Sequence, residues 1–184
     1  MSILDRIFIE EIDSVELAET VRRSIEELRT IHPEAGELMA LISEGLTLGD
    51  IAGFGDQHKE ALFQLGCRLM LCNEIEQAET IFVMLSLLDP LEARAHYGAG
   101  VAMKARGKLP GAAQFFMQFL ALDATNPVGY LRLGECLVAA GEIEEARSAF
   151  AAAEALASTG HGSKAQKNEA ADQIRLLSDN ILRH

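Results

Sequence analysis

Glycine and apolar positions recur every 34 residues along the middle of the chain. Gly66, Gly100 and Gly134 lie in three similar phrases, LFQLGCRLM, HYGAGVAMK and YLRLGECLV. Around each glycine, bulky or apolar residues stand at steps of three, one and three, which places them on one face of a helix. An alanine follows each glycine after 12 residues and an aromatic residue after 16. These alanine and aromatic pairs are Ala78 and Phe82, Ala112 and Phe116, and Ala146 and Phe150.

Each repeat therefore predicts two helices, with the glycine where they pack together. A glycine costs a helix about 1 kcal/mol relative to alanine, and close approach of the second helix must offset that cost. Asn73, Gly107 and Gly141 fall between the two predicted helices, and both residue types tolerate the left-handed backbone that ends many helices. A period of 34 with this spacing is typical of tetratricopeptide repeats, which stack into a superhelix with one continuous core.

Two more helices are predicted before the repeats, over residues 14–31 and 33–44. Ser14 is a suitable N-cap for the first, and Pro33 separates the two because it can open a helix but not continue one. Gly45 follows the end of the second, and the glycine-rich segment 46–57 is predicted to be a connection with a short helical turn. The inward faces are predicted to be Leu17, Val21, Ile25 and Leu28 in the first helix, and Leu38, Leu41 and Ile42 in the second.

The fold predicted for the whole chain is all-α, because no stretch alternates in the manner of a strand. Residues 1–57 form an N-terminal helical region that starts with an arm, 1–13, and could serve dimerisation. Residues 58–158 hold three repeats, and 159–184 hold a C-terminal capping helix with Ala170, Ile174, Leu177 and Ile181 on one face. The remaining helices are predicted at 58–72, 75–88, 92–106, 109–122, 127–140, 143–157 and 164–182.

Charge and composition narrow the class of partner and the compartment. The 184 residues carry a net charge of −12, which argues against nucleic acid and anionic membranes as ligands. The N-terminal sequence has no basic start and no uninterrupted apolar stretch, and no apolar run is long enough to cross a bilayer. Three scattered cysteines fit a reducing compartment. These features predict a cytoplasmic protein that does not insert into a membrane.

No catalytic or metal-binding constellation is found, so we expect no enzyme activity, no metal and no cofactor. The five histidines stand apart, and Cys67 and Cys72 fall on different faces of one helix. The segment GDIAGFG has no lysine after it and no strand before it, so it is not a phosphate loop. Cys72 and Cys136 are predicted to be small core residues.

The first helix of each pair is expected to line the concave side of the superhelix. The positions that face this groove form a mostly apolar trough suited to an extended apolar peptide. Two alternatives stay open for Phe63, Cys67, Met70 and Leu131, which could contact a ligand or only pack, either under the helix 33–44 or inside a dimer. Glu135 is either an edge charge or a solvated side chain, and Lys104 and Arg94 are either solvated or anchor a ligand. The predicted groove residues are Phe63, Cys67, Met70, Arg94, Tyr97, Val101, Lys104, Val128, Leu131, Glu135 and Val138.

The order of N-terminal helices, three repeats and a capping helix resembles the class II chaperones of bacterial type III secretion systems. The likeness covers about residues 45–158 and, more loosely, the last helix. It is carried by QAETIFVMLSLLDPLEARAHYGAGVAMKARGKLPGAAQFF and NPVGYLRLGECLVAAGEIEEARSAF, and within them most specifically by LLD at 87–89 and ECL at 135–137.

This resemblance implies a cytoplasmic bacterial protein that keeps hydrophobic translocator proteins soluble and ready for secretion. In the family a Pro-x-Leu-x-x-Pro segment of the translocator binds in the concave groove, against aromatic residues of the first repeat. Phe63, Cys67 and Met70 stand at the matching positions, so one aromatic residue remains here. Family members tend to dimerise through N-terminal helices, and some work with a transcription activator. The resemblance therefore implies two further partners, a second copy of the chain and a transcription activator.

Two other functions are compatible with a repeat fold. A co-chaperone that reads acidic C-terminal tails would need basic residues in the groove, where Phe63, Cys67, Tyr97 and Val101 stand instead. A scaffold or assembly protein of a secretion or pilus apparatus would need no such clamp. A gene neighbourhood with needle and translocator genes would favour the chaperone without excluding the scaffold.

Overall fold

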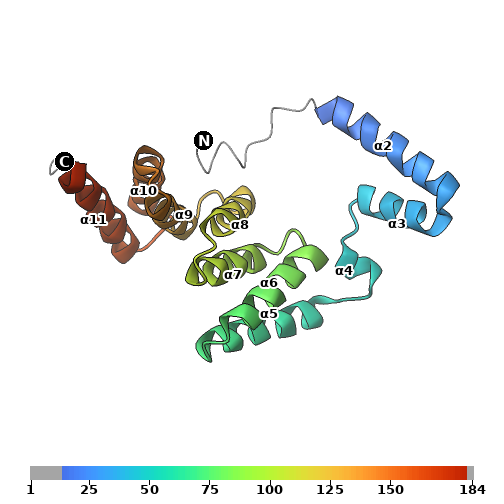
Figure 1. Cartoon of the computed structure of the whole chain (residues 1–184), viewed down its shortest axis with the longest axis horizontal. Coiled ribbons are helices and arrows are strands. Elements are labelled where there is room, and N and C mark those ends of the chain that lie inside the picture. Colours follow the sequence, from blue (N-terminus) through green and yellow to red (C-terminus); the bar gives the residue numbers. More distant parts are fainter. Residues whose placement is uncertain (1–13, 182–184) are drawn as a thin grey trace.

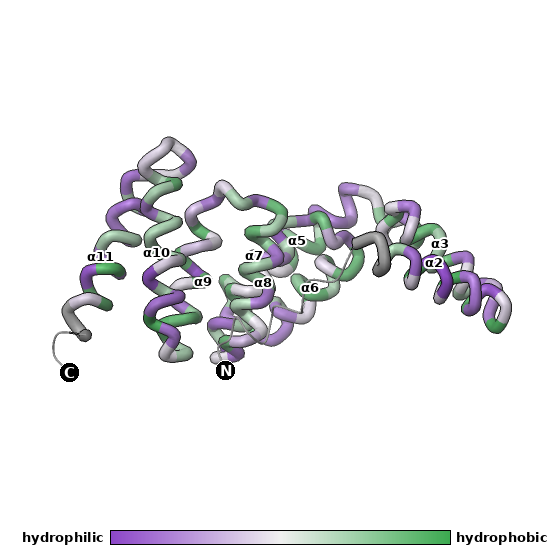
Figure 2. The backbone as a smooth tube through the Cα atoms, turned by 90° about the horizontal axis from the view of Figure 1, so that it is seen from above, coloured by the Kyte–Doolittle hydropathy of each residue, from purple (hydrophilic) through white to green (hydrophobic). Residues whose placement is uncertain are grey.

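The structure is a computed structural model that describes residues 14–181. Helices follow one another in a single curved row, with the α2–α3 hairpin at one end and α11 at the other (Figures 1 and 2). No strand occurs in residues 14–181. The helices are α2 Ser14–Ile31, α3 Pro33–Ser43, α4 Leu48–Ile51, α5 Asp56–Leu71, α6 Ile75–Leu88, α7 Ala93–Ala105, α8 Leu109–Leu122, α9 Pro127–Ala140, α10 Ile143–Ser158 and α11 Lys164–Ile181.

The six repeat helices pair as predicted, and the recurring glycines are where the two helices of a pair meet. A Cβ atom added at Gly66 would lie 2.7 Å from the Phe82 ring, and one at Gly100 would lie 2.7 Å from the Phe116 ring. Gly134 stands in the same relation to Phe150, at 2.5 Å. Each second-helix ring therefore occupies the space that a first-helix side chain would need, which confirms the reason given for the period of 34.

The turns inside the helix pairs have the predicted backbone conformation. Asn73, Gly107 and Gly141 have φ angles of 62°, 73° and 82°. A residue in this left-handed region ends a helix and turns the chain back so that the next helix runs antiparallel. Asn73 is the one non-glycine residue with positive φ in the described chain, and asparagine tolerates this conformation better than most residues.

Most of the core lies in the second and third repeats and α11. Phe116 and Phe150 are fully buried there, together with Cys136, and burial raises the pKa of the Cys136 thiol to about 11. Ala170 and Leu177 bring one face of α11 into the same core, as expected of a helix that covers the last repeat. Cys72 is exposed at the end of α5, so the prediction that it is a core residue is wrong.

The N-terminal hairpin packs mainly on itself. Ile25 is buried between α2 and α3, but Val21 and Leu38 are 40% and 37% exposed. The predictions that Val21 and Leu38 face inward are wrong, because α2 and α3 have mainly each other beside them rather than a second layer. The expected arm 1–13, the cap by the Ser14 side chain and the inward positions of Leu17 and Ile181 lie outside the side chains and segments that the structure describes.

Glu79 joins the first repeat to the turn of the second. Its side chain on α6 is buried, and its two carboxylate oxygens accept hydrogen bonds from Arg106 at 2.9 Å and Lys108 at 2.7 Å. Burial by itself would raise the pKa of Glu79, but the bonds from Lys108 and Arg106 outweigh it, so the pKa lies below its ordinary value of 4.5. The charged carboxylate therefore stabilises the junction between repeats.

Replacing Glu79 with glutamine should make the protein less sensitive to acid. A carboxylate with a lowered folded-state pKa contributes stability above pH 4.5, and that contribution disappears as the pH falls through the folded-state pKa. We expect Glu79→Gln to lower the free energy of unfolding at pH 7 by about 1–2 kcal/mol and to flatten its decline between pH 5 and 3. Urea unfolding at a series of pH values measures both effects.

Glu76→Gln is the matched control for this experiment. Glu76 also pairs with Arg106, at 3.0 Å, but its side chain is 77% exposed. Exposed ion pairs contribute little, so this variant should follow the pH profile of the unmodified protein. If both variants flattened the profile equally, the buried pair would not be the source of the effect.

Candidate functional site: the concave groove

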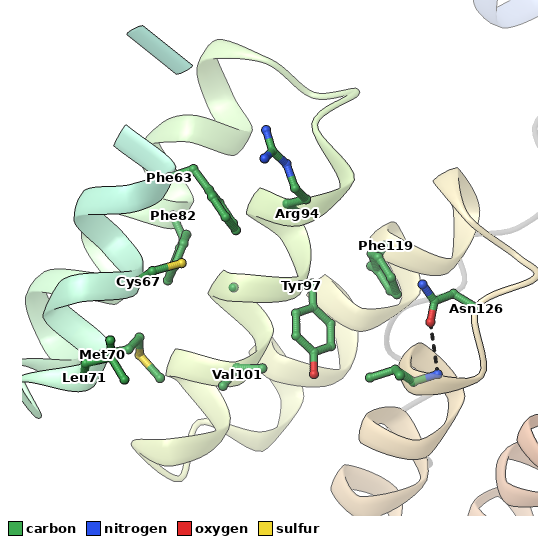
Figure 3. Close-up of a pocket in the computed structure, with 12 residues that line it drawn as sticks. Phe63, Cys67, Met70, Leu71, Phe82, Arg94, Tyr97, Val101, Phe119 and Asn126 are labelled. Atoms are coloured by element: carbon green, nitrogen blue, oxygen red, sulfur yellow. Dashed lines mark hydrogen bonds between the residues drawn. The ribbon is translucent and has the colours of Figure 1, made fainter. Parts of the chain in front are cut away.

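An apolar cavity of about 680 Å³ opens on the concave side of the first two repeats. Its walls are the first helices of the repeats, α5 and α7, and one end reaches the start of α9 (Figure 3). We call this cavity the concave groove. It is lined by Phe63, Cys67, Met70, Leu71, Phe82, Arg94, Tyr97, Gly98, Val101, Phe119, Asn126 and Val128.

Seven of the predicted groove residues lie together in this lining because the repeats stack in register. Phe63, Cys67 and Met70 follow one another on α5 at steps of four and three, so they share the face that looks across at α7. Tyr97 and Val101 stand 34 residues after Phe63 and Cys67 and face them from α7. Arg94 at the start of α7 and Val128 at the start of α9 complete the set.

The aromatic side chains of the groove are held in place by rings behind them. Tyr97 packs with its ring centroid 5.9 Å from that of Phe116 and 5.3 Å from that of Phe119. Phe63 lies 5.9 Å from Phe82, also in a tilted arrangement. Such offset contacts stabilise aromatic pairs beyond the area that they bury. The groove is therefore a preformed surface rather than a set of free side chains.

Arg94 is the single charged residue in the groove lining, and its charge is already compensated. The guanidinium carbon lies 4.5 Å from the centre of the Phe63 ring. Nη2 donates to Glu92 at 2.8 Å and Nη1 to Glu60 at 2.9 Å, and these bonds raise the pKa of Arg94 further. Arg94 is thus anchored rather than simply solvated. No unpaired cation remains in the lining to clamp the carboxylate of an acidic tail.

The other four predicted groove residues lie outside this cavity. Lys104 on α7 forms an ion pair with Glu135 on α9, and Glu135 also pairs with Arg132. Arg132 reaches on to Glu169 of α11 at 3.1 Å, so a charged network crosses the third repeat where an apolar trough was expected. Leu131 is 1% exposed and belongs to the core, so of its two predicted roles it packs within the protein rather than facing the groove. Val138 packs against the same core.

Five lining residues were not predicted. Phe82 and Phe119 are buried side chains of the second helices, and their rings also line the cavity between the first helices. Gly98 is the second glycine in the phrase HYGAG, which could have marked it as a place of close approach. Leu71 extends the rim, and Asn126 is the N-cap of α9, its Oδ1 accepting from the Val128 amide at 3.2 Å.

The described side chains bring no further chemistry to the groove. No group of three or more His, Cys, Asp or Glu residues among them could hold a metal ion. No helix within residues 14–181 has both the length and the apolarity that a membrane span requires.

Comparison with known proteins agrees with this geometry. A sequence profile described as tetratricopeptide repeat matches residues 103–166, from the end of α7 to the start of α11. PcrH from Pseudomonas aeruginosa, solved with the chaperone binding region of PopD, superimposes with a TM-score of 0.66 at 25% sequence identity, over 70% of this chain and 96% of PcrH. The chain has the tetratricopeptide-repeat fold of the type III secretion translocator chaperones.

Two further solved structures share this translocator-chaperone fold. SycD of Yersinia enterocolitica, a type III secretion translocator chaperone, matches with a TM-score of 0.67 at 23% identity, over 72% of this chain and 98% of SycD. A chain in a type III secretion complex from Aeromonas hydrophila matches with a TM-score of 0.74 at 24% identity, over 80% of this chain and 99% of its own length. The resemblance predicted from the sequence is confirmed at the level of this fold. No curated protein sequence matches the chain.

Proposed function

We propose that this protein is a cytoplasmic chaperone of type III secretion translocator proteins and that it binds an extended apolar segment of its cargo in the concave groove. The observation that carries the proposal is the apolar, aromatic-walled cavity across the first two repeats. Fold similarity to PcrH and SycD adds support, because PcrH was solved with the chaperone binding region of PopD and SycD with a peptide of YopD. We propose no catalytic role.

The physical chemistry of the groove suits this role. A translocator must be apolar enough to enter a membrane, so in water it is prone to aggregate. Covering one apolar segment lowers that risk, and the net charge of −12 on the chaperone helps to keep the complex in solution. Release at the secretion apparatus requires moderate affinity, about −8 to −12 kcal/mol, which corresponds to micromolar to nanomolar binding.

The cargo segment that we propose is an extended one of the form Pro-x-Leu-x-x-Pro. Prolines keep a peptide extended and lower the entropy lost on binding. The groove lining has one charged residue, and that residue is paired. The groove therefore selects by shape and apolar contact rather than by charge.

Two glutamates in the groove should abolish binding of such a peptide. We expect Pro-x-Leu-x-x-Pro peptides from candidate translocators to bind the unmodified chain at micromolar concentration or tighter in calorimetry. In Phe63→Glu/Tyr97→Glu, two carboxylates would have to be buried beneath the bound peptide, which costs several kcal/mol. We therefore expect a loss of affinity of more than about 100-fold.

Ala61→Glu/Ala105→Glu is the control for added charge. Both alanines are exposed, lie on the same two helices α5 and α7, and are absent from the groove lining. This variant should bind as the unmodified chain does, and circular dichroism should show the same helix content for all three proteins. Failure of every peptide to bind the unmodified chain would reject the groove as the cargo site and favour a scaffold.

The N-terminal hairpin supports a second interaction beside the groove. Ile31, Leu38 and Met39 are 70%, 37% and 39% exposed on two helices that pack mainly on each other. We propose that a second copy of the chain covers this hairpin, in keeping with the dimer in which SycD was solved. Measuring the molecular mass of the protein in solution tests this proposal. A monomeric mass would reject the dimer and leave the hairpin free to bind a component of the secretion apparatus, as the scaffold hypothesis requires. Cooperation with a transcription activator stays a prediction.

A further inference from the structure

The floor of the concave groove between α5 and α7 is the ring of Phe82. This residue belongs to α6, behind both helices, and is 2% exposed, yet it lines the cavity. It reaches the groove because a glycine faces it from each side. A Cβ atom added at Gly66 would lie 2.7 Å from the ring, and one added at Gly98 would lie 2.6 Å from it.

Gly98 makes this junction different from the others in the row. One period earlier the chain has Gln64, and one period later it has Arg132. The Arg132 side chain is committed to Glu135 and Glu169. Of these three positions, only Gly98 lacks a side chain that would cover the second-layer ring behind it, so the ring of Phe82 reaches the groove between α5 and α7, while Phe119 of α8 forms the floor farther along, toward α9.

Cys67 widens the groove directly above that floor. The matching positions in the next two repeats hold Val101 and Glu135, both larger than cysteine. Cys67 packs against the cluster around Phe82, and its side chain lies beside that ring in Figure 3. A small residue in the wall and a recessed ring in the floor together leave a hollow between Phe63 and Tyr97.

The walls of this hollow are aromatic rings and sulfur atoms. Phe63 cannot swing inward freely, because Arg94 lies over its face and Phe82 contacts it. Met70 and Cys67 supply two polarisable sulfur atoms, which make favourable contacts with aromatic rings. Rings that stay in place and present edges and faces favour another ring in a tilted or offset arrangement.

We propose that the hollow over Phe82 is the anchor subsite of the groove and that it selects an aromatic side chain of the cargo rather than leucine. Cys67 and Gly98 set this preference, Cys67 through its small size and Gly98 by admitting Phe82 to the floor. The inference rests on the proposed function and revises one position of its cargo motif. The residue that binds deepest, written as leucine in Pro-x-Leu-x-x-Pro, is expected to be aromatic in the cargo of this chain.

Three peptides that differ at one position test the preference on the unmodified protein. The probes are capped synthetic peptides Ser-Pro-Ala-X-Ala-Ser-Pro-Ser in which X is phenylalanine, leucine or alanine. We expect the phenylalanine peptide to bind about three- to tenfold more tightly than the leucine peptide, the range that an added aromatic pair contributes. The alanine peptide should bind most weakly. Calorimetry or fluorescence competition measures all three.

Cys67→Phe should reverse this order. The new ring fills the hollow, so the phenylalanine peptide should lose at least about tenfold in affinity, and the leucine peptide should lose less. Cys72→Phe is the matched control, because it makes the same substitution at an exposed position on the end of the same helix, outside the groove lining. It should leave all three affinities unchanged.

The possible results distinguish failure of the aromatic subsite from failure of the proposed chaperone function. Leucine binding as tightly as phenylalanine would overturn the aromatic subsite while leaving the chaperone groove in place. Equal losses for both peptides in Cys67→Phe would also overturn it, since Cys67 would then not discriminate between side chains. Binding of none of the peptides at millimolar concentration would overturn the proposed function together with the subsite.

Discussion

Replacing Phe116 with alanine should lower the free energy of unfolding by about 3–5 kcal/mol, the range for a buried phenylalanine. Phe116 is fully buried in the main core, fills the space beside Gly100 and supports Tyr97 from behind. Removing its ring leaves a cavity between the two helices of the second repeat, which rigid neighbours can close only in part. Urea unfolding followed by circular dichroism measures the loss.

Phe115→Ala provides the comparison for this prediction. Phe115 directly precedes Phe116, and its replacement by alanine removes the same atoms. Its side chain is only half-buried, with the ring centroid 6.0 Å from that of His96. We expect less than half the loss seen at Phe116. Equal losses at the two positions would mean that burial against Gly100 does not set the energy of this junction.

Adding a side chain at Gly100 should cost about 2–3 kcal/mol, as overpacking in a core does. A Cβ atom there would lie 2.7 Å from the Phe116 ring, which is enclosed and cannot move aside. In Gly100→Val the clash must therefore separate α7 from α8. We expect the midpoint of thermal or urea unfolding to fall accordingly, with part of the loss recovered in Gly100→Val/Phe116→Leu because the smaller side chain makes room.

Gly111→Val is the control for a glycine in the same repeat. The nearest atom to a Cβ added at Gly111 is the sulfur of Met103, at 2.9 Å, and it lies toward the end of a flexible side chain that can rotate away. We expect a loss below about 1 kcal/mol there. A larger loss at Gly111 than at Gly100 would contradict the role given to the recurring glycines.

The sequence was sufficient to predict the helices because repeat folds depend on local, periodic signals. The predicted segments 75–88, 109–122 and 127–140 agree with α6, α8 and α9 at both ends. Asn73, Gly107 and Gly141 also have the predicted left-handed backbone. These features depend on residues within one repeat, and such residues recur in register.

The groove was only partly predictable because its shape depends on contacts between repeats. The period places Leu131 and Glu135 on the concave face, but neither lines the cavity, since Leu131 packs into the core and Glu135 pairs with Lys104 and Arg132. No single-repeat pattern indicates such a pairing. Cys72 was misassigned for a related reason, because a small apolar residue at a helix end is buried only if a neighbouring element covers it.

The hydrophobic core is larger at the C-terminal end of the row of helices than beside the groove. The main cluster joins α8 to α11, whereas the cluster around Phe82 beside the groove is small. In a linear array, each unit is stabilised by its neighbours, and an end unit lacks one of them. The α2–α3 hairpin packs mainly on itself and gives α5 and α6 little support, so a segment lying in the groove would supply contacts that this end of the row lacks. Part of the binding free energy then suppresses local unfolding of the α5–α6 pair. The first repeat is therefore less stable when the groove is empty than when a cargo segment is bound.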